Sequence, residues 1–174
     1  MSDPGWIHAA VERYERPLVA YAHRHLGDVE AARDVVQDAF LRLCAQDHAV
    51  VADHLAEWLF TVCRNLALDR LRRRPREVAM HTQDSVIAEL PASASPPSQP
   101  LEAAEARAGL LALLATLPPR QQEIVRLRFQ QGLSYKQIAA ITSLSATNVG
   151  FLIHTAIRAL HQRAPADLEL NHAH

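Results

Sequence analysis

Apolar residues recur every three or four positions along the first part of the chain, which predicts a series of amphipathic helices. The first covers residues 5–26, where Pro17 predicts a kink or a break because proline lacks the N–H that a helix interior needs. The second, GDVEAARDVVQDAFLRLCAQ, has a strong apolar stripe and the N-cap candidate Asp28. A third, LAEWLFTVCRNLALDRLRRR, covers residues 55–74, and the DHAVVADH before it predicts a loop or a frayed helix.

The periodicity stops at Pro75 and resumes near residue 102. The segment LPASASPPSQP between them has the proline-rich, small-residue composition of a linker. Helices are expected over 102–116 and within LPPRQQEIVRLRFQQGL, where Pro118 and Pro119 suit a first turn and Gly132 suits a C-cap. We predict an all-α protein in four parts: a helical domain over 1–76, a flexible linker over 77–101, a helical domain over 102–163 and a disordered tail over 164–174.

The last two helices are spaced as in a helix-turn-helix. Ser134 is expected to cap the first of them, residues 143–145 form the turn with Leu144 buried, and Ser145 caps the second. At about 100° per residue, the second helix turns one face inward: Val149, Leu152, Ile153, Ala156 and Leu160. The opposite face gathers Thr147, Asn148, Phe151, His154, Thr155, Arg158 and Gln162.

Phe151 lies in the middle of this outward face, where a DNA-reading helix would usually carry cations. An outward phenylalanine contacts either the methyl group of a thymine or another protein. Few cations surround it, so attraction to phosphates is weak here. An ordinary helical hairpin is the alternative to a DNA-binding motif.

Charge is distributed unevenly, although the 174 residues carry a net charge of −1. Residues 1–63 hold ten acidic and five basic residues, residues 64–76 hold six arginines and one acid, and residues 105–163 hold seven basic and two acidic residues. This distribution indicates two kinds of partner surface. With no secretory signal and no apolar run of about 20 residues, we expect a soluble, cytoplasmic protein without membrane insertion. Cys44 and Cys63 are expected to be reduced core residues.

No pattern in the sequence indicates catalysis. The ten histidines form no ligand set of recognised spacing, so surface histidines rather than a metal site are expected. No glycine-rich phosphate loop or G-x-S-x-G nucleophile motif is present. We therefore expect no catalytic residue, no metal and no cofactor, and a protein that is not an enzyme.

Three blocks together resemble the extracytoplasmic-function (ECF) sigma factors of bacterial RNA polymerase. GDVEAARDVVQDAFLRL is similar to the polymerase-binding helix of that family, and EWLFTVCRNLALDRLRRR to the helix that engages the minus-ten promoter element. LATLPPRQQEIVRLRFQQGLSYKQIAAITSLS resembles the start of the domain that reads the minus-thirty-five element. The resemblance implies a sigma factor that binds core polymerase, recognises promoter DNA and helps to open it.

For the polymerase, the resemblance implies docking on the clamp helices of the β′ subunit, with the β subunit as a further contact. The residues assigned to this docking are Asp34, Gln37, Asp38 and Arg42. A solvated helix face explains the same pattern equally well. The family also implies an anti-sigma factor as a partner, which these residues do not identify.

For the minus-ten DNA, the resemblance assigns Asn65 and Asp69, which lie four residues apart on one helical face. Nearby arginines suit contacts with phosphates, which position a protein without reading sequence: Arg70, Arg72, Arg73 and Arg74. The alternative is a solvated helix end, because cations also complement a helix C-terminus. The segment 46–54 matches a loop that captures a base in the family, but it lacks the Phe and Gly often seen there.

The outward face of the last helix is the largest departure from the family, because Gly150, Phe151 and Leu152 stand where a basic series is usual. Direct reading of the minus-thirty-five element is assigned to Thr147, Asn148, Phe151, Thr155 and Arg158. Two other functions remain open at this point. One is a helix-turn-helix regulator that acts without polymerase, and the other is a polymerase-bound adaptor whose C-terminal domain docks a protein.

Overall fold

The computed structural model describes residues 4–73 and 101–163, with the side chains described from residue 107 onward in the second range. The described residues form helices and short connections, and no strand occurs among them. The chain divides into two compact units, Met1–Ser95 and Pro96–His174. The predictions of an all-α fold and of two helical domains are confirmed.

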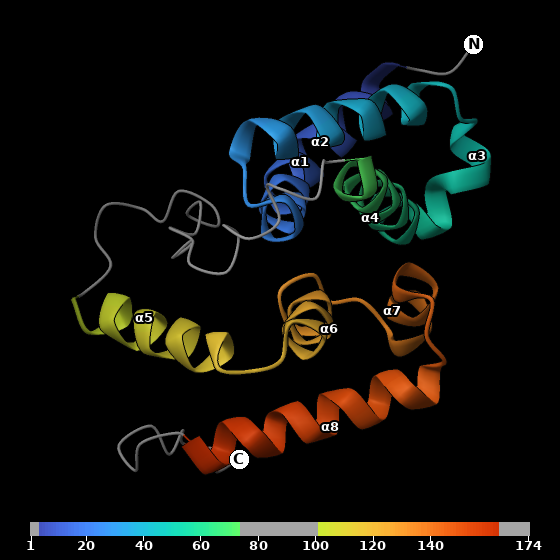
Figure 1. The fold of residues 1–174 in the computed structure, drawn as a ribbon. Helices are drawn as coiled ribbons and strands as arrows, with labels where there is room; N and C mark the ends of the chain where they lie inside the picture. The colour runs from blue at the N-terminus through green and yellow to red at the C-terminus, as the bar shows by residue number, and fades with distance from the viewer. Residues whose placement is uncertain (1–3, 74–100, 164–174) are drawn as a thin grey trace. The chain divides into compact units, whose positions relative to one another are not determined.

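The N-terminal domain is built on three long helices, α1, α2 and α4, each of which packs against the other two (Figure 1). A short helix and a 3-10 turn connect the second of these helices to the third. The helices are α1 (Pro4–Leu26), α2 (Val29–Cys44), α3 (His48–Val51), η1 (Ala52–His54) and α4 (Leu55–Arg73).

The core of this domain lies where the apolar stripes of the three long helices meet. Leu18 and Leu26 from α1, Leu43 from α2 and Phe60 from α4 are all buried. The ring of Tyr21 meets that of Phe60 edge-on, with 5.2 Å between the ring centroids. Burial of each such side chain stabilises the fold by roughly 1.5–3 kcal/mol, so packing rather than helix propensity holds these helices.

Helix α1 continues through Pro17, so of the kink or break predicted there, the break does not occur. Proline removes one N–H from the helical ladder, but the residues on both sides of it are anchored by packing. Leu18 directly after it and Ala22 further along are fully buried, and Ala10, about two turns before it, is buried as well. Tertiary packing therefore outweighs the local preference of this proline.

The start of α2 is capped as predicted. The Asp28 carboxylate accepts hydrogen bonds from the N–H groups of Glu30, at 2.9 Å, and Ala31, at 3.1 Å. Gly27 before it has φ 69°, the left-handed conformation that turns the chain from α1 into α2. This cap fixes where α2 begins and hence which of its residues face outward.

The C-terminal domain arranges three helices around the longest one, α8, against which the other three pack (Figure 1). Its core includes Ile124, Ile138 and Val149, each fully buried, and Ala156 at the centre of α8. The helices are α5 (Leu101–Ala115), α6 (Pro119–Phe129), α7 (Tyr135–Thr142) and α8 (Ala146–Arg163).

The predicted helix-turn-helix is present as α7 and α8, which meet at a bend of 103°. Ser134 and Gln137 form a reciprocal capping box at the start of α7, and the Ser145 hydroxyl accepts a hydrogen bond from the Asn148 N–H at 3.1 Å. In the turn, Ser143 adopts φ 57° and the Leu144 N–H donates to the carbonyl of Ala139 at 3.0 Å. Both serine caps are therefore confirmed.

Two details of this domain differ from the predictions. Leu144 is half-buried rather than buried, because the turn that carries it lies at the surface. The C-cap of α6 is Gln130 rather than Gly132, whose φ of 67° instead turns the chain two residues later. The inward face of α8 follows the prediction, with Val149, Ile153 and Ala156 buried and Leu152 and Leu160 half-buried.

No single helix among the described residues is both long and apolar enough to cross a bilayer. Helices α7 and α8 taken together, bent by 103°, reach the required length and composition.

The two cysteines occupy different environments, so the prediction that both are core residues is wrong for Cys44. Cys44 is exposed at the last residue of α2, whereas Cys63 is buried, with its Sγ 3.9 Å from the carbonyl oxygen of Leu18. Burial raises the pKa of the Cys63 thiol to about 12. Cys44 lies about 100° around the helix from the fully buried Leu43, so it faces away from the covered stripe.

We predict that a thiol reagent will modify one cysteine in the folded protein. Near pH 8, Cys44 should react within minutes, whereas Cys63 should react only after denaturation, because its thiolate does not form and its sulfur is covered. Mass spectrometry after labelling, with and without denaturant, checks this. The Cys44→Ser variant is the control and should show no labelling when folded; rapid labelling of Cys63 in that variant would contradict the burial.

The left-handed residue in the turn also allows a prediction of stability. Ser143→Gly should raise the free energy of unfolding by about 1 kcal/mol, because glycine adopts this conformation without the steric penalty of a Cβ. Ala140→Gly, an exposed position inside α7, is the matched control and should lower it by about 1 kcal/mol. Urea denaturation of the three proteins measures both changes, and a destabilised Ser143→Gly variant would refute the account of the turn.

Candidate polymerase and nucleic-acid interfaces

The outer face of α2 carries the residues assigned to polymerase docking. Asp34, Gln37, Asp38 and Arg42 are all exposed and lie opposite the buried stripe. Leu41 lies among them with 62% of its surface exposed. The face therefore combines charged groups with one large apolar side chain, a composition found in protein interfaces.

Leu41 was not predicted as an exposed contact residue, although its position in the sequence indicates it. At about 100° per residue, Leu41 lies on the opposite side of the helix from Ala39, Phe40 and Leu43, which are buried. A leucine out of phase with a regular apolar stripe has no intramolecular partner to explain it.

An ion pair joins the outer face of α2 to α4. The Arg70 Nη2 lies 3.0 Å from the Asp34 Oδ2, and the two side chains are 41% and 60% exposed. One predicted polymerase-binding residue and one predicted DNA-binding residue therefore contact each other. Because the pair is largely solvated, it contributes at most about 1 kcal/mol and each partner can exchange it for another.

The other residues assigned to minus-ten DNA lie along the C-terminal half of α4. Asn65 and Asp69 are exposed, and the Asp69 carboxylate accepts a hydrogen bond from Arg72 at 3.3 Å. Arg73 is exposed at the last described turn. Arg74, the remaining member of the predicted set, lies outside the described residues.

The segment before α4 is helical rather than a loop, as α3 and η1. Asp47 caps α3 by accepting a hydrogen bond from the Ala49 N–H at 3.0 Å, and buried Val51 anchors the segment to the core. Val50 points the other way, with 64% of its surface exposed. The segment is thus held by its N-cap and by Val51, and Val50 is its large exposed apolar side chain.

The outward face of α8 is placed as its sequence predicts. Thr147, Asn148, Phe151 and Arg158 are exposed, while Thr155 is half-buried. The Thr155 hydroxyl donates to the carbonyl of Phe151 at 2.6 Å, so that hydroxyl offers an acceptor rather than a donor to a partner. Phe151 itself has 66% of its surface exposed.

Tyr135 is a second aromatic residue beside this face that the sequence analysis did not assign. It begins α7, is 41% exposed, and lies under the guanidinium of Arg128, 5.4 Å from the ring centroid. Its ring also approaches α8, since a Cβ at Gly150 would lie 3.5 Å from the Tyr135 Cε2. A glycine inside a helix lowers its stability by about 1 kcal/mol relative to alanine. The presence of Gly150 within α8 was therefore the sign in the sequence that another side chain approaches the helix there.

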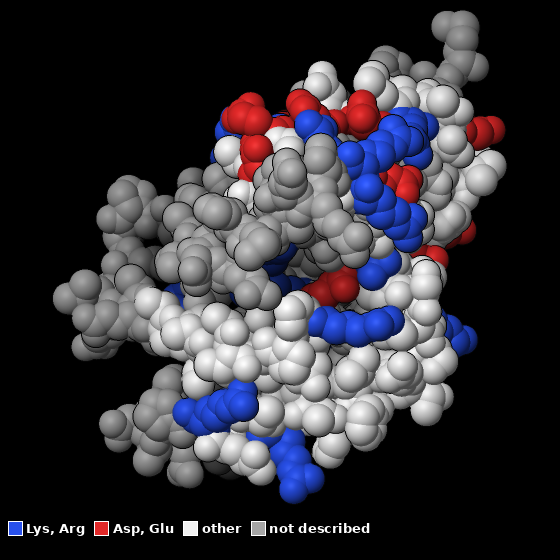
Figure 2. Space-filling model, viewed as in Figure 1, with Lys and Arg blue, Asp and Glu red and all other residues white. Residues whose placement is uncertain are grey.

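The charges of the two domains differ in the way the sequence indicates. On the face shown in Figure 2, acidic side chains gather on the N-terminal domain beside a run of cations, while the C-terminal domain is mostly uncharged with separate cations. Within the described residues, no three His, Cys, Asp or Glu side chains are grouped as a metal ion would require.

Two family profiles match the chain, each over one of the domains. The profile for Sigma-70 region 2 matches residues 10–77, and that for Sigma-70 region 4 matches residues 107–160. SigL, an ECF RNA polymerase sigma factor of Mycobacterium tuberculosis, is 35% identical over 159 residues, which covers 88% of this chain and 86% of SigL. The chain belongs to the ECF sigma factor family. Regions 2 and 4 thus contain the outer faces of α2, α4 and α8 described above.

Other relatives differ in length. SigI of Mycobacterium tuberculosis, a probable ECF sigma factor, is 31% identical over 97% of this chain, but the chain spans only 59% of SigI. Among solved structures, the sigma factor RpoE of Bartonella quintana in complex with the anti-sigma factor NepR matches with a TM-score of 0.54 and 26% identity. That match covers 84% of this ECF sigma factor and 88% of RpoE.

For this ECF sigma factor, we predict that the Asp34–Arg70 ion pair is a weak, exchangeable contact. A double-mutant cycle with Asp34→Ala and Arg70→Ala should give a coupling energy below about 1 kcal/mol that decreases with added salt, because both groups are solvated. The exposed Asp69–Arg72 pair serves as the matched control. Urea denaturation at low and high salt measures the cycle, and a salt-independent coupling above about 3 kcal/mol would mean a buried, fixed pair instead.

Proposed function

We propose that this protein is a sigma factor that binds core RNA polymerase and directs promoter recognition and opening. The observation that supports this most is the presence, in one chain and in order, of regions 2 and 4, with most of the predicted contact residues in the described ranges exposed. The protein would supply recognition to a polymerase that performs the chemistry. It needs no catalytic residue or cofactor of its own, and it acts in the cytoplasm.

In this proposal the outer face of α2 docks on the clamp helices of β′. Leu41 supplies the apolar centre of the contact, while Asp34, Gln37, Asp38 and Arg42 form its polar rim. Interfaces of this kind owe most of their affinity to a few apolar anchors surrounded by polar side chains. A contact of region 4 with the β subunit completes the holoenzyme.

The C-terminal half of α4 then meets the minus-ten DNA. Asn65 and Asp69 offer hydrogen-bonding groups to unpaired bases, and Arg72 and Arg73 contact phosphates. Arg70 joins these contacts when Asp34 engages the polymerase, because the exposed ion pair between them is easily exchanged.

At the minus-thirty-five element, α8 enters the major groove with its N-terminal residues toward the bases. Thr147 and Asn148 are suited to hydrogen bonds with base edges, and Phe151 to contact with a thymine methyl. An adaptor role, in which this domain docks a protein, is the second candidate, and the 66% exposure of Phe151 favours it. RpoE binds the anti-sigma factor NepR, and we propose an anti-sigma factor as a partner of this protein too.

Run-off transcription tests the proposed function. A promoter fragment is first selected by sequencing the genomic DNA that the reconstituted holoenzyme retains. Purified bacterial core polymerase should transcribe this fragment only when this protein is added. Core polymerase alone is the control. Failure of the protein to bind the polymerase would refute the proposal.

We predict that Leu41→Ser weakens binding to core polymerase about tenfold, because it removes the exposed apolar anchor of α2. Val50→Ser, an equally exposed apolar residue of the same domain, should leave this affinity unchanged. Co-purification with core polymerase at increasing concentrations measures both variants, and circular dichroism verifies their folding. Equal losses for the two variants would show that the outer face of α2 is not the docking surface.

The two candidate roles of α8 are separated by Phe151→Ala and Arg158→Ala. If α8 reads DNA, each variant should reduce run-off transcription severalfold on the selected promoter, and changes in the minus-thirty-five sequence should do the same. Insensitivity of transcription to both variants and to that sequence would favour the adaptor.

A further inference from the structure

A ring contact joins the start of α1 to the short segment that precedes α4. The indole ring of Trp6 lies against the imidazole ring of His48, the first residue of α3, with 4.8 Å between the ring centroids and 48° between the ring planes. Trp6 is half-buried, whereas His48 is exposed. The contact therefore presents one aromatic ring to solvent and supports it with a second, less exposed ring.

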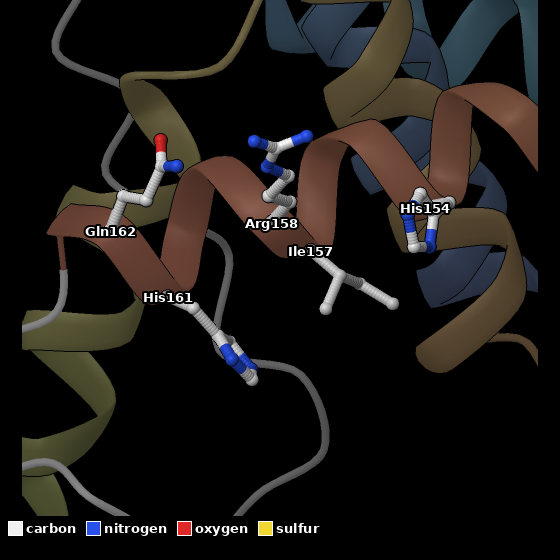
Figure 3. Close-up of a pocket in the computed structure, with 5 residues that line it drawn as sticks. All are labelled: His154, Ile157, Arg158, His161 and Gln162. Carbon is white, nitrogen blue, oxygen red and sulfur yellow. The ribbon is translucent and has the colours of Figure 1, made fainter.

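This contact differs from the other ring contacts of the described residues. Tyr21 meets His25 and Phe60, and because Tyr21 and Phe60 are buried, those contacts belong to the core. The exposed imidazoles of α8, His154 and His161, project separately from that helix (Figure 3), and neither takes part in a ring contact within the described ranges. The pair at the start of α1 is thus the described ring contact that offers an exposed ring to a ligand.

The indole N–H of Trp6 is a second unusual feature of this contact. It is buried, and within the part of the chain that the structure describes it has no hydrogen-bond partner. A buried donor without a partner lowers stability, and a phenylalanine would supply a ring here without that loss. Fold stability alone therefore does not account for an indole. The imidazole beside it has one acceptor nitrogen in its neutral form, so a turn of the His48 ring supplies the missing partner.

The segment that carries His48 suits a flat, largely apolar ligand. Its backbone is fixed, because Asp47 caps α3 and the buried Val51 anchors the segment to the core. Two positions after His48, Val50 has 64% of its surface exposed. An exposed ring near an exposed aliphatic side chain fits a nucleobase, because unpaired bases bind by stacking on aromatic side chains.

Promoter opening, as proposed above, leaves bases unpaired at the domain that contains this segment. Segment 46–54 itself contains no phenylalanine, tyrosine or tryptophan. Trp6 lies outside residues 10–77, which the profile for Sigma-70 region 2 matches. The aromatic support of the segment therefore comes from a residue that this profile does not include.

We infer that an unpaired base of the opened minus-ten DNA stacks on the ring of His48 and that Trp6 is the positioning residue that holds this ring. On binding, the His48 ring turns to lie parallel to the base, and its acceptor nitrogen receives the hydrogen bond of the Trp6 indole. The inference rests on the proposed function and adds one base contact and one positioning residue to its minus-ten site.

A cycle that combines a protein variant with a missing base tests the contact. The full chain is assembled with core polymerase near pH 8, and the promoter fragment selected above has its minus-ten bases left unpaired by a mismatched opposite strand. Competition binding gives the dissociation constant for the intact fragment and for fragments with one abasic site at each minus-ten position. On intact DNA, His48→Ala should weaken binding at least about fivefold, the ordinary effect of losing one stacked base. At one abasic position this difference should disappear, because the base that His48 contacts is already missing.

Trp6→Phe separates positioning from packing. It keeps a ring and removes the unpaired N–H, so the free protein should unfold at a higher urea concentration while the holoenzyme binds intact DNA about threefold more weakly. A purely structural role would move both quantities in the same direction. In the His48→Ala background, Trp6→Phe should have no further effect on DNA binding, because the ring that it positions is gone. Tyr14→Phe, at another half-buried aromatic residue of α1, is the matched control and should leave DNA binding unchanged.

The inference is overturned if His48→Ala weakens binding equally on intact DNA and at every abasic position. It is also overturned if Trp6→Phe leaves DNA affinity unchanged or destabilises the free protein, or if Tyr14→Phe loses as much DNA affinity as Trp6→Phe. Polymerase binding and run-off transcription by the unmodified protein are measured alongside. If both are intact and the base coupling is missing, the inference alone fails, whereas absence of polymerase binding refutes the proposed function.

Discussion

Each helix of this protein has two faces, and burial of the apolar face is what keeps the helix folded. A helix of 8 to 23 residues is marginal in water without such packing. α1, α2 and α4 bury their stripes against one another, and α5, α6 and α7 bury theirs against α8. The opposite face of each helix is then the surface available to a partner. The exposed residues of α2, α4 and α8 are therefore the ones available to contact a polymerase or DNA.

Short capping contacts determine which residues those faces present. Asp28 fixes the start of α2, and Ser134, Ser143 and Ser145 fix the start of α7, the turn and the start of α8. A slip of one residue would rotate α8 by about 100° and bury a different set of side chains. The caps thus place Phe151, rather than Leu152 or Ile153, at the centre of the outer face.

Local patterns in the sequence predicted the long helices, the N-caps Asp28, Ser134 and Ser145, and most of the exposed residues of α8, because periodicity and capping depend on neighbours within four residues. They failed where distant contacts decide. Packing on both sides of Pro17 keeps α1 continuous, and the last residue of α2, Cys44, is exposed although its neighbour Leu43 is buried. The Asp34–Arg70 ion pair joins residues 36 apart in sequence, so no local pattern could reveal it. Leu41 could have been recognised from the sequence, because it is out of phase with the apolar stripe of α2, but it was not predicted as a contact residue.

The N-terminal domain combines an acidic outer face with a cationic helix end, whereas the helix-turn-helix carries no acidic residue and few permanent cations. In the proposed function, the charged N-terminal domain contacts the polymerase and the minus-ten DNA, and the helix-turn-helix contacts upstream DNA with few permanent cations. Phe151, with 66% of its surface exposed, is the proposed apolar element of that contact. Anchoring through one domain raises the effective concentration of the other at its site.

The claim that the outer face of α2 meets the polymerase is tested most directly by site-specific photo-crosslinking. A photoreactive phenylalanine analogue in place of Leu41 should link covalently to the β′ subunit in the reconstituted holoenzyme, whereas the same analogue in place of Phe151 should not. Absence of a β′ adduct from position 41, in a holoenzyme that still forms and transcribes, would contradict the account.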